Sequence, residues 1–291
     1  MKNLPVSCTV NPTVGFGERR AHAGAGGRVV VVGGGPAGQE AARAAAEDGR
    51  DVTLFESQAV LGGRLALAAA TGGRDGWRPY LNWLASELSR LGVVVRQETA
   101  ATPDEVRAEE PDVVILACGS IGHPGIDGAL ELDAFCAADG APARVALVDE
   151  GAAGPPLWTA ALEASMRGAR EVTIVTPLPA VCGDLDGATF LALYGDLTRR
   201  GVSFLTDHVA TAREGDSLTA TNIYSGRTAT VKADLVVSAA ARRPAGDQLL
   251  AQLGDVQTIT IGDARAPRDA AAAIREGQNA LSELAARSKS T

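Results

Sequence analysis

The sequence predicts an α/β protein built on parallel sheets with helices packed against them. Segments typical of strands alternate with segments typical of helices along most of the 291 residues, which is the order that parallel strands with helical crossovers require. Hydrophobic residues make up 46% of the chain but aromatic residues only 4%, so the cores of two medium-sized domains would consist mainly of Ala, Val and Leu. Four cysteines without a CxxC spacing favour reduced thiols over a disulfide framework.

The net charge and the hydropathy pattern exclude two classes of partner. The formal net charge of −8 would repel nucleic acid and the anionic surface of a membrane. No apolar run approaches the roughly 20 residues needed to span a bilayer, and the first residues lack the apolar core of a signal peptide. We therefore expect a cytoplasmic protein that binds neither nucleic acid nor membranes.

The first strand carries the most informative motif, a glycine-rich turn that leads into a helix. Residues 29–38 read VVVVGGGPAG, and the next strand, DVTLF, is followed by Glu56. The spaced glycines would give a tight turn, a close approach to a pyrophosphate and close packing of helix on strand, while the helix N-terminus offers unpaired N–H groups. A carboxylate about 20 residues further on accepts hydrogen bonds from ribose hydroxyls and repels a 2′-phosphate. The pattern predicts a dinucleotide-binding βαβ unit that contacts its ligand through Gly33, Gly35, Pro36, Ala37, Gly38 and Glu56.

The rest of the chain divides into an arm and two α/β blocks. Residues 1–26 contain two prolines and four glycines without a hydrophobic period, which is typical of an extended arm. The first block runs over residues 27–122 and the second over residues 143–231. Residues 232–291 add two strand segments and a closing helix.

Three short motifs outside the first turn carry a family resemblance. They are LGGR at residues 61–64, ACGS at residues 117–120 and IGD at residues 261–263. Together with the glycine-rich turn, they resemble the motifs of flavoproteins with two nested dinucleotide-binding domains of the glutathione-reductase type. The resemblance implies contacts to FAD from Gly62, Gly63, Arg64, Gly119, Gly262 and Asp263.

The resemblance also assigns the blocks to domains. In such flavoproteins the first domain is interrupted by the second and completed by the C-terminal segment. We therefore expect an FAD-binding domain formed by residues 27–122 and 232–291, with an NAD(P)-like domain inserted at 143–231. Asp263 leaves an alternative open, because an acid just before the last helix can also serve as its N-cap.

The inserted block has a degenerate nucleotide loop. Its first strand ends in Asp149 and Glu150, so two carboxylates stand where a pyrophosphate would lie, and the following helix starts with Pro155 and Pro156, which lack N–H groups. The next strand ends at Thr176, with neither an acid for the ribose of NAD nor an arginine for the phosphate of NADP. We therefore expect weak or absent NAD(P)H binding.

This degenerate loop and the strand EVTIVTP resemble the C-terminal half of the trimethylamine dehydrogenase and 2,4-dienoyl-CoA reductase group of old yellow enzyme-like flavoproteins. Members of that group carry an FMN-binding TIM barrel and a 4Fe–4S cluster in front of their nested domains. Residues 8–18, CTVNPTVGFGE, are similar to the segment that holds the last of the four cluster cysteines. The resemblance implies a split enzyme, in which a partner chain supplies the barrel and three cysteines, and Cys8 completes the 4Fe–4S cluster. The alternative is that Cys8 is an ordinary thiol in the arm.

The function expected from this resemblance is that of an FAD-binding electron-transfer subunit of a heteromeric iron–sulfur flavoprotein oxidoreductase, of the amine dehydrogenase or N-demethylase type. FMN is expected only in the TIM-barrel catalytic partner, and an electron-accepting flavoprotein is a further expected partner. Two alternatives stay open. In the first alternative, the glycine-rich site of the expected FAD-binding domain holds ADP as a structural ligand. In the second, the chain is a free-standing NAD(P)H-dependent flavin reductase. The degenerate loop argues against the second. No catalytic side chain is assigned, since the histidines and cysteines form no constellation for acid–base or disulfide chemistry.

Overall fold

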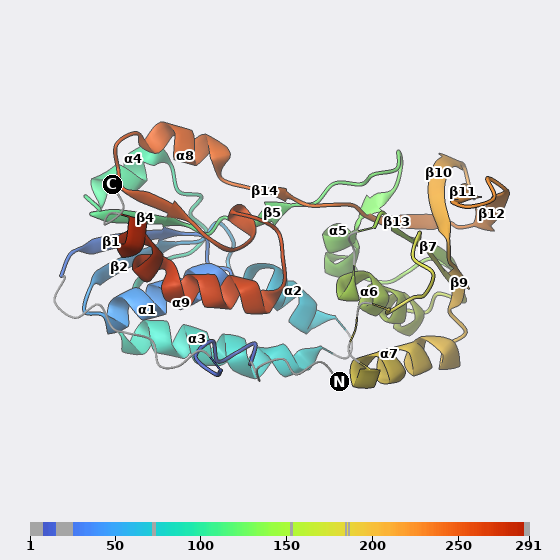
Figure 1. Cartoon of the computed structure of the whole chain (residues 1–291), viewed down its shortest axis with the longest axis horizontal. Coiled ribbons are helices and arrows are strands. Elements are labelled where there is room, and N and C mark those ends of the chain that lie inside the picture. Colours follow the sequence, from blue (N-terminus) through green and yellow to red (C-terminus); the bar gives the residue numbers. More distant parts are fainter. Residues whose placement is uncertain are drawn as a thin grey trace. The chain divides into compact units, whose positions relative to one another are not determined.

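The computed structural model of the chain describes residues 8–15, 26–71, 74–151, 154–183, 185 and 187–287, and side chains up to residue 282. Much of the predicted arm, including Glu18, therefore lies outside the described residues. The chain splits into two compact units. The first comprises Met1–Ala66, Gly76–Ile121 and Arg243–Thr291, and the second comprises Leu67–Asp75 and Gly122–Arg242. Described residues from the N-terminal and the C-terminal parts of the chain, blue and red in Figure 1, thus both contribute to the first unit.

The first unit is built on a five-stranded parallel sheet in the order β15-β4-β1-β2-β3. Strand β1 lies at its centre because its four consecutive valines are buried on both faces, as an inner parallel strand requires. Val31 pairs in register with Leu54 on one side and with Ile115 on the other. The strands are β1 (Arg28–Val32), β2 (Asp51–Phe55), β3 (Val94–Arg96), β4 (Val113–Leu116) and β15 (Thr258–Thr260).

Helices cover both faces of this sheet (Figure 1). Val29 and Val31 pack with α1, α3 and α9 on one face, whereas Val30 and Val32 pack with α4 and α8 on the other. The helices that follow these strands are α1 (Pro36–Glu47), α2 (Gly63–Ala70), α3 (Arg78–Arg90), α4 (Pro103–Ala108), α8 (Asp247–Leu253) and α9 (Ala270–Arg287), with the 3-10 helices η1 (Asp75–Trp77) and η2 (Gly262–Ala264). An antiparallel pair, β5 (Ser120–Ile121) and β14 (Arg243–Pro244), lies where the chain leaves and re-enters this unit.

The second unit repeats the parallel architecture with a different cover. Its five-stranded sheet has the order β6-β13-β7-β8-β9. One face packs against α5, α6 and α7, where Trp158 is fully buried, and the other packs against a three-stranded antiparallel sheet (Figure 1). The elements are β6 (Leu130–Glu131), α5 (Leu132–Ala137), β7 (Arg144–Asp149), α6 (Pro155–Met166), β8 (Glu171–Val175), α7 (Gly187–Arg199), β9 (Ser203–Leu205), β10 (His208–Glu214), β11 (Ser217–Asn222), β12 (Thr228–Lys232) and β13 (Leu235–Ala239).

The prediction of an α/β fold with parallel sheets and helical crossovers is confirmed. Within the part of the chain that the structure describes, the strands form sheets of five, five, three and two strands, and none closes into a TIM barrel. Over the same residues, no helix is both long and apolar enough to cross a membrane.

Candidate dinucleotide-binding site

The carboxyl end of β1 turns into α1 through glycines with different roles. A Cβ on Gly33 would lie 2.3 Å from the carbonyl oxygen of Ala117, and a Cβ on Gly38 would lie 1.8 Å from that of Gly33. The packing of the protein itself therefore requires these two glycines. A Cβ on Gly35 would instead meet no heavy atom within 4 Å, so the space beside Gly35 is open. Here the backbone can be approached by a ligand.

The start of α1 faces this open space. Gly35 is the N-cap residue and Pro36 takes the first helical position, where its fixed φ suits the helix and its missing N–H costs nothing. The N–H groups that follow, beginning with Ala37, have no acceptor inside the helix and carry the positive end of the helix dipole. Such a helix end binds a phosphate or pyrophosphate group.

Glu56 is held at the end of β2 beside the glycine turn. Its side chain is buried, Oε2 accepts a hydrogen bond of 2.7 Å from the N–H of Gly34, and Oε1 accepts one of 2.7 Å from the N–H of Gln58. Two backbone donors thus fix the carboxylate, which keeps further lone pairs for ribose hydroxyls. This placement is what the sequence spacing predicts for an adenosine-binding acid.

The loop at Gly62 and Gly63 lies directly on the first turn. The N–H of Gly62 donates a hydrogen bond of 2.8 Å to the carbonyl oxygen of Gly34, and a Cβ on Gly63 would lie 3.3 Å from the Cα of Gly35. Both residues have positive φ, 113° and 51°, a conformation that glycine adopts without strain. The two glycine motifs therefore form one continuous backbone surface around Gly35.

Asp263 forms a polar cluster with residues from two other segments. The hydroxyl of Ser120 donates a hydrogen bond of 3.0 Å to Asp263 Oδ2, and Arg64 Nη1 lies 3.9 Å from the same oxygen. Ser120 follows Gly119, which has φ 75° and whose carbonyl oxygen accepts a hydrogen bond of 3.0 Å from the N–H of Ala245. The structure thus brings Arg64, Gly119 and Asp263 together, although they are far apart in the sequence.

Asp269, and not Asp263, accepts a hydrogen bond from the first turn of the last helix. Helix α9 begins at Ala270, and Asp269 Oδ1 accepts a hydrogen bond of 2.7 Å from the N–H of Ala272. Asp263 lies in η2 and accepts a hydrogen bond of 3.0 Å from the N–H of Arg268 through Oδ1. Its carboxylate is therefore fixed by the turn and by Ser120 rather than by the helix.

Three residues at this site were not identified from the sequence. Ser120 belongs to the ACGS motif but was not predicted to contact the site, yet its hydroxyl donates to Asp263. Gln39 is fully buried and donates a hydrogen bond of 3.0 Å to the carbonyl oxygen of Gly34, while its Oε1 has no hydrogen-bond partner among the described residues. Glu276 on α9 accepts a hydrogen bond of 2.7 Å from the N–H of Gly262. Ser120 had a signal, its place next to Gly119, whereas Gln39 and Glu276 are polar positions on helices and had none.

At the carboxyl ends of the strands of the second unit, side chains of the protein bind one another and nearby backbone. Asp149 Oδ2 accepts a hydrogen bond of 2.8 Å from the hydroxyl of Thr176, and Asp149 Oδ1 accepts one of 2.8 Å from the N–H of Gly151. Glu150 Oε1 accepts a hydrogen bond from the hydroxyl of Ser238. Helix α6 begins with prolines at its first two positions, so donors are missing at the helix end that would face a phosphate.

None of the four cysteines forms a disulfide bond. Burial raises the pKa of the Cys118 thiol, and burial followed by the charge of Asp133 raises the pKa of Cys136 to about 11. Thiols of this kind are unreactive at neutral pH. Across the described ranges, no group of three or more His, Cys, Asp or Glu side chains could hold a metal ion, so Cys8 as a cluster ligand stays a prediction.

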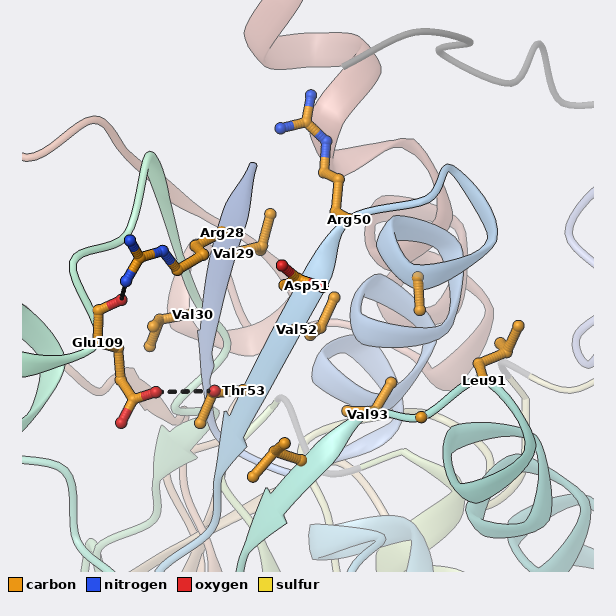
Figure 2. A pocket seen from close by; sticks show the side chains of 13 residues that line it. Arg28, Val29, Val30, Arg50, Asp51, Val52, Thr53, Leu91, Val93 and Glu109 are labelled. Carbon is orange, nitrogen blue, oxygen red and sulfur yellow. Dashed lines mark hydrogen bonds between the residues drawn. The ribbon is translucent and has the colours of Figure 1, made fainter. Parts of the chain in front are cut away.

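Two cavities of the first unit lie away from these strand ends. One of about 310 Å³ lies at the amino ends of β1 and β2, where Arg28 and Glu109 line it (Figure 2). The other, of about 820 Å³, is lined by residues 10–13 of the arm and by side chains of α1 and α3. Ligands of open parallel sheets bind outside the carboxyl ends of the strands, and neither cavity lies there.

The chain is similar to several known flavoprotein oxidoreductases. The sequence profile of the pyridine nucleotide-disulphide oxidoreductase family matches residues 27–264. An NADH oxidase of Thermoanaerobacter brockii is 34% identical over 280 residues, which cover 90% of this chain and 42% of that protein. An N,N-dimethylglycine/sarcosine dehydrogenase of Chromohalobacter salexigens is 34% identical over 234 residues, covering 68% of this chain and 31% of the relative.

Among solved structures, a histamine dehydrogenase from Rhizobium sp. 4-9 is similar with a TM-score of 0.86 and 26% identity, covering 95% of this chain and 48% of that one. The chain thus spans less than half the length of each of these three relatives. The family profile nevertheless covers most of the chain, including both units. The chain therefore belongs to the pyridine nucleotide-disulphide oxidoreductase family, a family of flavin-dependent oxidoreductases.

Proposed function

We propose that this chain is the FAD-binding, electron-transferring half of a larger flavoprotein oxidoreductase. One observation supports the proposal most strongly: Glu56 and the loop at Gly62 and Gly63 both contact the glycine turn, which has open space at Gly35. The Ser120–Asp263 pair lies beside Arg64, the residue that follows this loop. The matching edge of the second unit is occupied by Asp149 and its partners.

The residues of the first unit fit a bound dinucleotide. The open space at Gly35 lies at a helix N-terminus suited to a pyrophosphate, and Glu56 lies where adenosine hydroxyls would need an acceptor. The buried Oε1 of Gln39, beside the turn, has no hydrogen-bond partner in the part of the protein described, so a ligand or ordered water there would satisfy it. Gly33, Gly38 and Pro36 shape this end, and Arg64 with Asp263 provides polar groups for the rest of FAD.

The chemistry divides between the cofactor and the chain. FAD, when bound, accepts and donates electrons, and the protein needs no side-chain nucleophile for this. Glu56 and the glycine turn hold the adenosine diphosphate part, while Gly62, Gly63 and Gly119 let backbone approach the remainder. Asp263 is oriented by Ser120, so its charge lies at a fixed place in the site.

We further propose that a partner chain carries the catalytic centre. More than half of each relative reported above has no counterpart in this chain. Two of them are named for the dehydrogenation of amines, histamine and N,N-dimethylglycine or sarcosine, which favours an amine as substrate. In this proposal the partner holds FMN in a TIM barrel, and Cys8 adds one ligand to a 4Fe–4S cluster.

A cofactor-binding experiment tests the proposal. Nucleotide is removed from the purified chain, and FAD, ADP and FMN are each titrated while tryptophan fluorescence and calorimetric heat are followed. The expected result is saturable binding of FAD that is tighter than the binding of ADP, with no binding of FMN. Equal affinity for ADP and FAD would make the chain a structural ADP-binding subunit, and absence of all binding would overturn the proposal.

One observation favours a second candidate, an NAD(P)H-dependent flavin reductase: the relative that covers 90% of this chain is named as an NADH oxidase. The filled edge of the second unit argues against it for this chain. Oxidation of NADH by the FAD-loaded chain alone, followed at 340 nm, separates the two functions.

A further inference from the structure

Glu276 on α9 touches the turn that carries Asp263, although the two residues lie on different elements. Oε2 of Glu276 accepts a hydrogen bond of 2.7 Å from the N–H of Gly262, the residue just before Asp263. The carboxylate is mostly buried, with 12% of its side-chain surface exposed. Such a hydrogen bond to a charged group in a buried place is stronger than one between neutral groups.

The second oxygen of Glu276 is held by two arginines of the same turn. Arg268 Nη2 donates a hydrogen bond to Oε1, and Arg265 Nη1 lies 3.5 Å from the same atom. The backbone N–H of Arg268 donates to Asp263 Oδ1 at 3.0 Å. Glu276 therefore contacts the turn on both sides of Asp263, through Gly262 before it and Arg268 after it.

Helix α9 is itself fixed at this point against the start of α1. A Cβ on Gly277 would lie 2.3 Å from the carbonyl oxygen of Ala37, so the two helices are in backbone contact there. A Cβ on Gly262, which has φ 60°, would lie 2.8 Å from the Cβ of Ala37. The turn thus lies between α1 and α9, and Glu276 is next to the close contact of the two helices at Gly277.

We propose that Glu276 is a positioning residue of the flavin site, which holds the turn at Gly262 so that the carboxylate of Asp263 stays in line with Ser120. The inference rests on the proposed FAD-binding function. It makes Glu276 important for the part of the cofactor beyond the adenosine diphosphate, because Glu276 binds the turn that carries Asp263, whereas Glu56 binds the N–H groups of Gly34 and Gln58. Loss of the carboxylate frees the N–H of Gly262 and the guanidinium of Arg268 beside Asp263.

Two substitutions and a matched control test the proposal. Glu276→Ala removes both oxygens, and Glu276→Gln keeps an oxygen that can accept from Gly262. Glu109→Ala is the control, because Glu109 also binds an arginine, Arg96, and a second donor, Thr53, and it lines the cavity at the amino ends of β1 and β2 (Figure 2). The affinities for FAD and for ADP are measured by titration of the nucleotide-free proteins, and the visible circular dichroism of bound flavin is recorded.

The expected result is a loss of FAD affinity of about tenfold in Glu276→Ala, with ADP affinity unchanged and the flavin dichroism altered. Glu276→Gln should recover most of the FAD affinity, and Glu109→Ala should change neither affinity. If Glu276 had a merely structural role, Glu276→Ala would lower the affinities for FAD and ADP alike. That result would overturn the inference, and so would unchanged FAD binding in Glu276→Ala.

Hydrogen exchange in the nucleotide-free proteins gives a second, independent readout. The amide of Gly262 should exchange faster in Glu276→Ala than in the unaltered protein, because its acceptor is gone. An unchanged exchange rate would count against the positioning role even if the variant bound FAD poorly. If the unaltered protein bound FAD no more tightly than ADP, the proposed function would fail and the inference with it.

Discussion

Asp149 and Thr176 join the carboxyl ends of β7 and β8 through a buried hydrogen bond of 2.8 Å between Asp149 Oδ2 and the threonine hydroxyl. In a dinucleotide-binding domain these two strand ends receive the pyrophosphate and the ribose. Here the acid of the first strand is turned toward the position at which the ribose-binding acid of the second strand would stand. The protein's own side chains thus replace contacts that a nucleotide would need.

This relationship leads to a prediction about nicotinamide nucleotides. We expect no saturable binding of NADH or NADPH at micromolar concentrations, because Asp149 and Glu150 would repel a pyrophosphate and α6 starts with two prolines. Titration calorimetry measures it, with FAD titrated into the same preparation as a positive control. Saturable heats with either nicotinamide nucleotide would show that the second unit binds it despite these contacts.

The same hydrogen bond should contribute to stability. Thr176→Val keeps the shape of the side chain but removes the donor to the buried Asp149 carboxylate and the acceptor for the N–H of Leu178, so we expect a loss of about 2 kcal/mol in the free energy of unfolding. Thr159→Val is the matched control, since the hydroxyl of Thr159 donates to carbonyl oxygens of its own helix, those of Pro155 and Pro156. Urea denaturation compares the two, and equal effects would contradict the role given to the Asp149–Thr176 contact.

Substitutions of two glycines in the first turn should have different effects on the free energy of unfolding and on the affinity for FAD. Gly35→Ala fills open space and should change the free energy of unfolding by no more than about 1 kcal/mol while it abolishes FAD binding. Gly38→Ala forces a methyl group against the carbonyl oxygen of Gly33, so it should destabilise the protein by about 3 kcal/mol. Thermal unfolding and FAD titration measure both quantities. A Gly35→Ala protein that binds FAD normally would exclude the open space as the pyrophosphate site.

An acid-sensitive ion cluster in the second unit predicts a pH dependence of stability. The hydrogen bond from Arg144 lowers the pKa of Asp234 below its ordinary value of 3.8, and the hydrogen bond from Lys232 does the same for Asp216. Above the ordinary value both carboxylates are ionised whether the protein is folded or unfolded, so their stabilising contribution is fully present. It is lost as the pH falls through the lowered pKa values of the folded state.

Arg144→Met tests the direction of this pH dependence. The variant loses its charged donor to both carboxylates, so its stability should fall less steeply than that of the unaltered protein as the pH decreases below 4. Melting temperatures between pH 3 and 7 measure the slopes. A steeper fall in the variant would reverse the sign assigned to these groups.

The cluster hypothesis makes a prediction about iron. The complex isolated with its partner should contain less iron when Cys8 is replaced by Ser, because a 4Fe–4S cluster requires four ligands. Cys136→Ser is the control, since burial keeps the Cys136 thiol protonated with a pKa of about 11. Iron is determined per mole of the chain in both variants, and an unchanged content in Cys8→Ser would rule Cys8 out as a ligand.

Local sequence patterns predicted the fold because each has a direct geometric cause. The run of valines in β1 is buried on both faces, and the spaced glycines that follow are required by contacts with Ala117 and with the turn itself. The closing helix, expected within residues 232–291, is observed as α9 at Ala270–Arg287. These features depend on neighbours within a few residues or on one backbone approach.

The polar contacts of the site could not be predicted in the same way. Glu276 meets Gly262 only because α9 packs back on α1, and the sequence shows no sign of that register. Sequence spacing indicated that Asp149 was the wrong residue type beside a phosphate, but only the fold shows that it binds Thr176. Such pairings are set by tertiary packing between elements that are distant in the chain.

The nucleotide that the protein carries from its native host tests the central proposal most directly. The chain is isolated with the chains that accompany it and denatured, and the released nucleotide is identified by mass spectrometry after a visible spectrum of the intact sample. The proposed function predicts released FAD and the absorption bands of a protein-bound flavin. Release of ADP alone, from a sample without flavin bands in this chain, would contradict electron transfer by this chain and leave it a structural role.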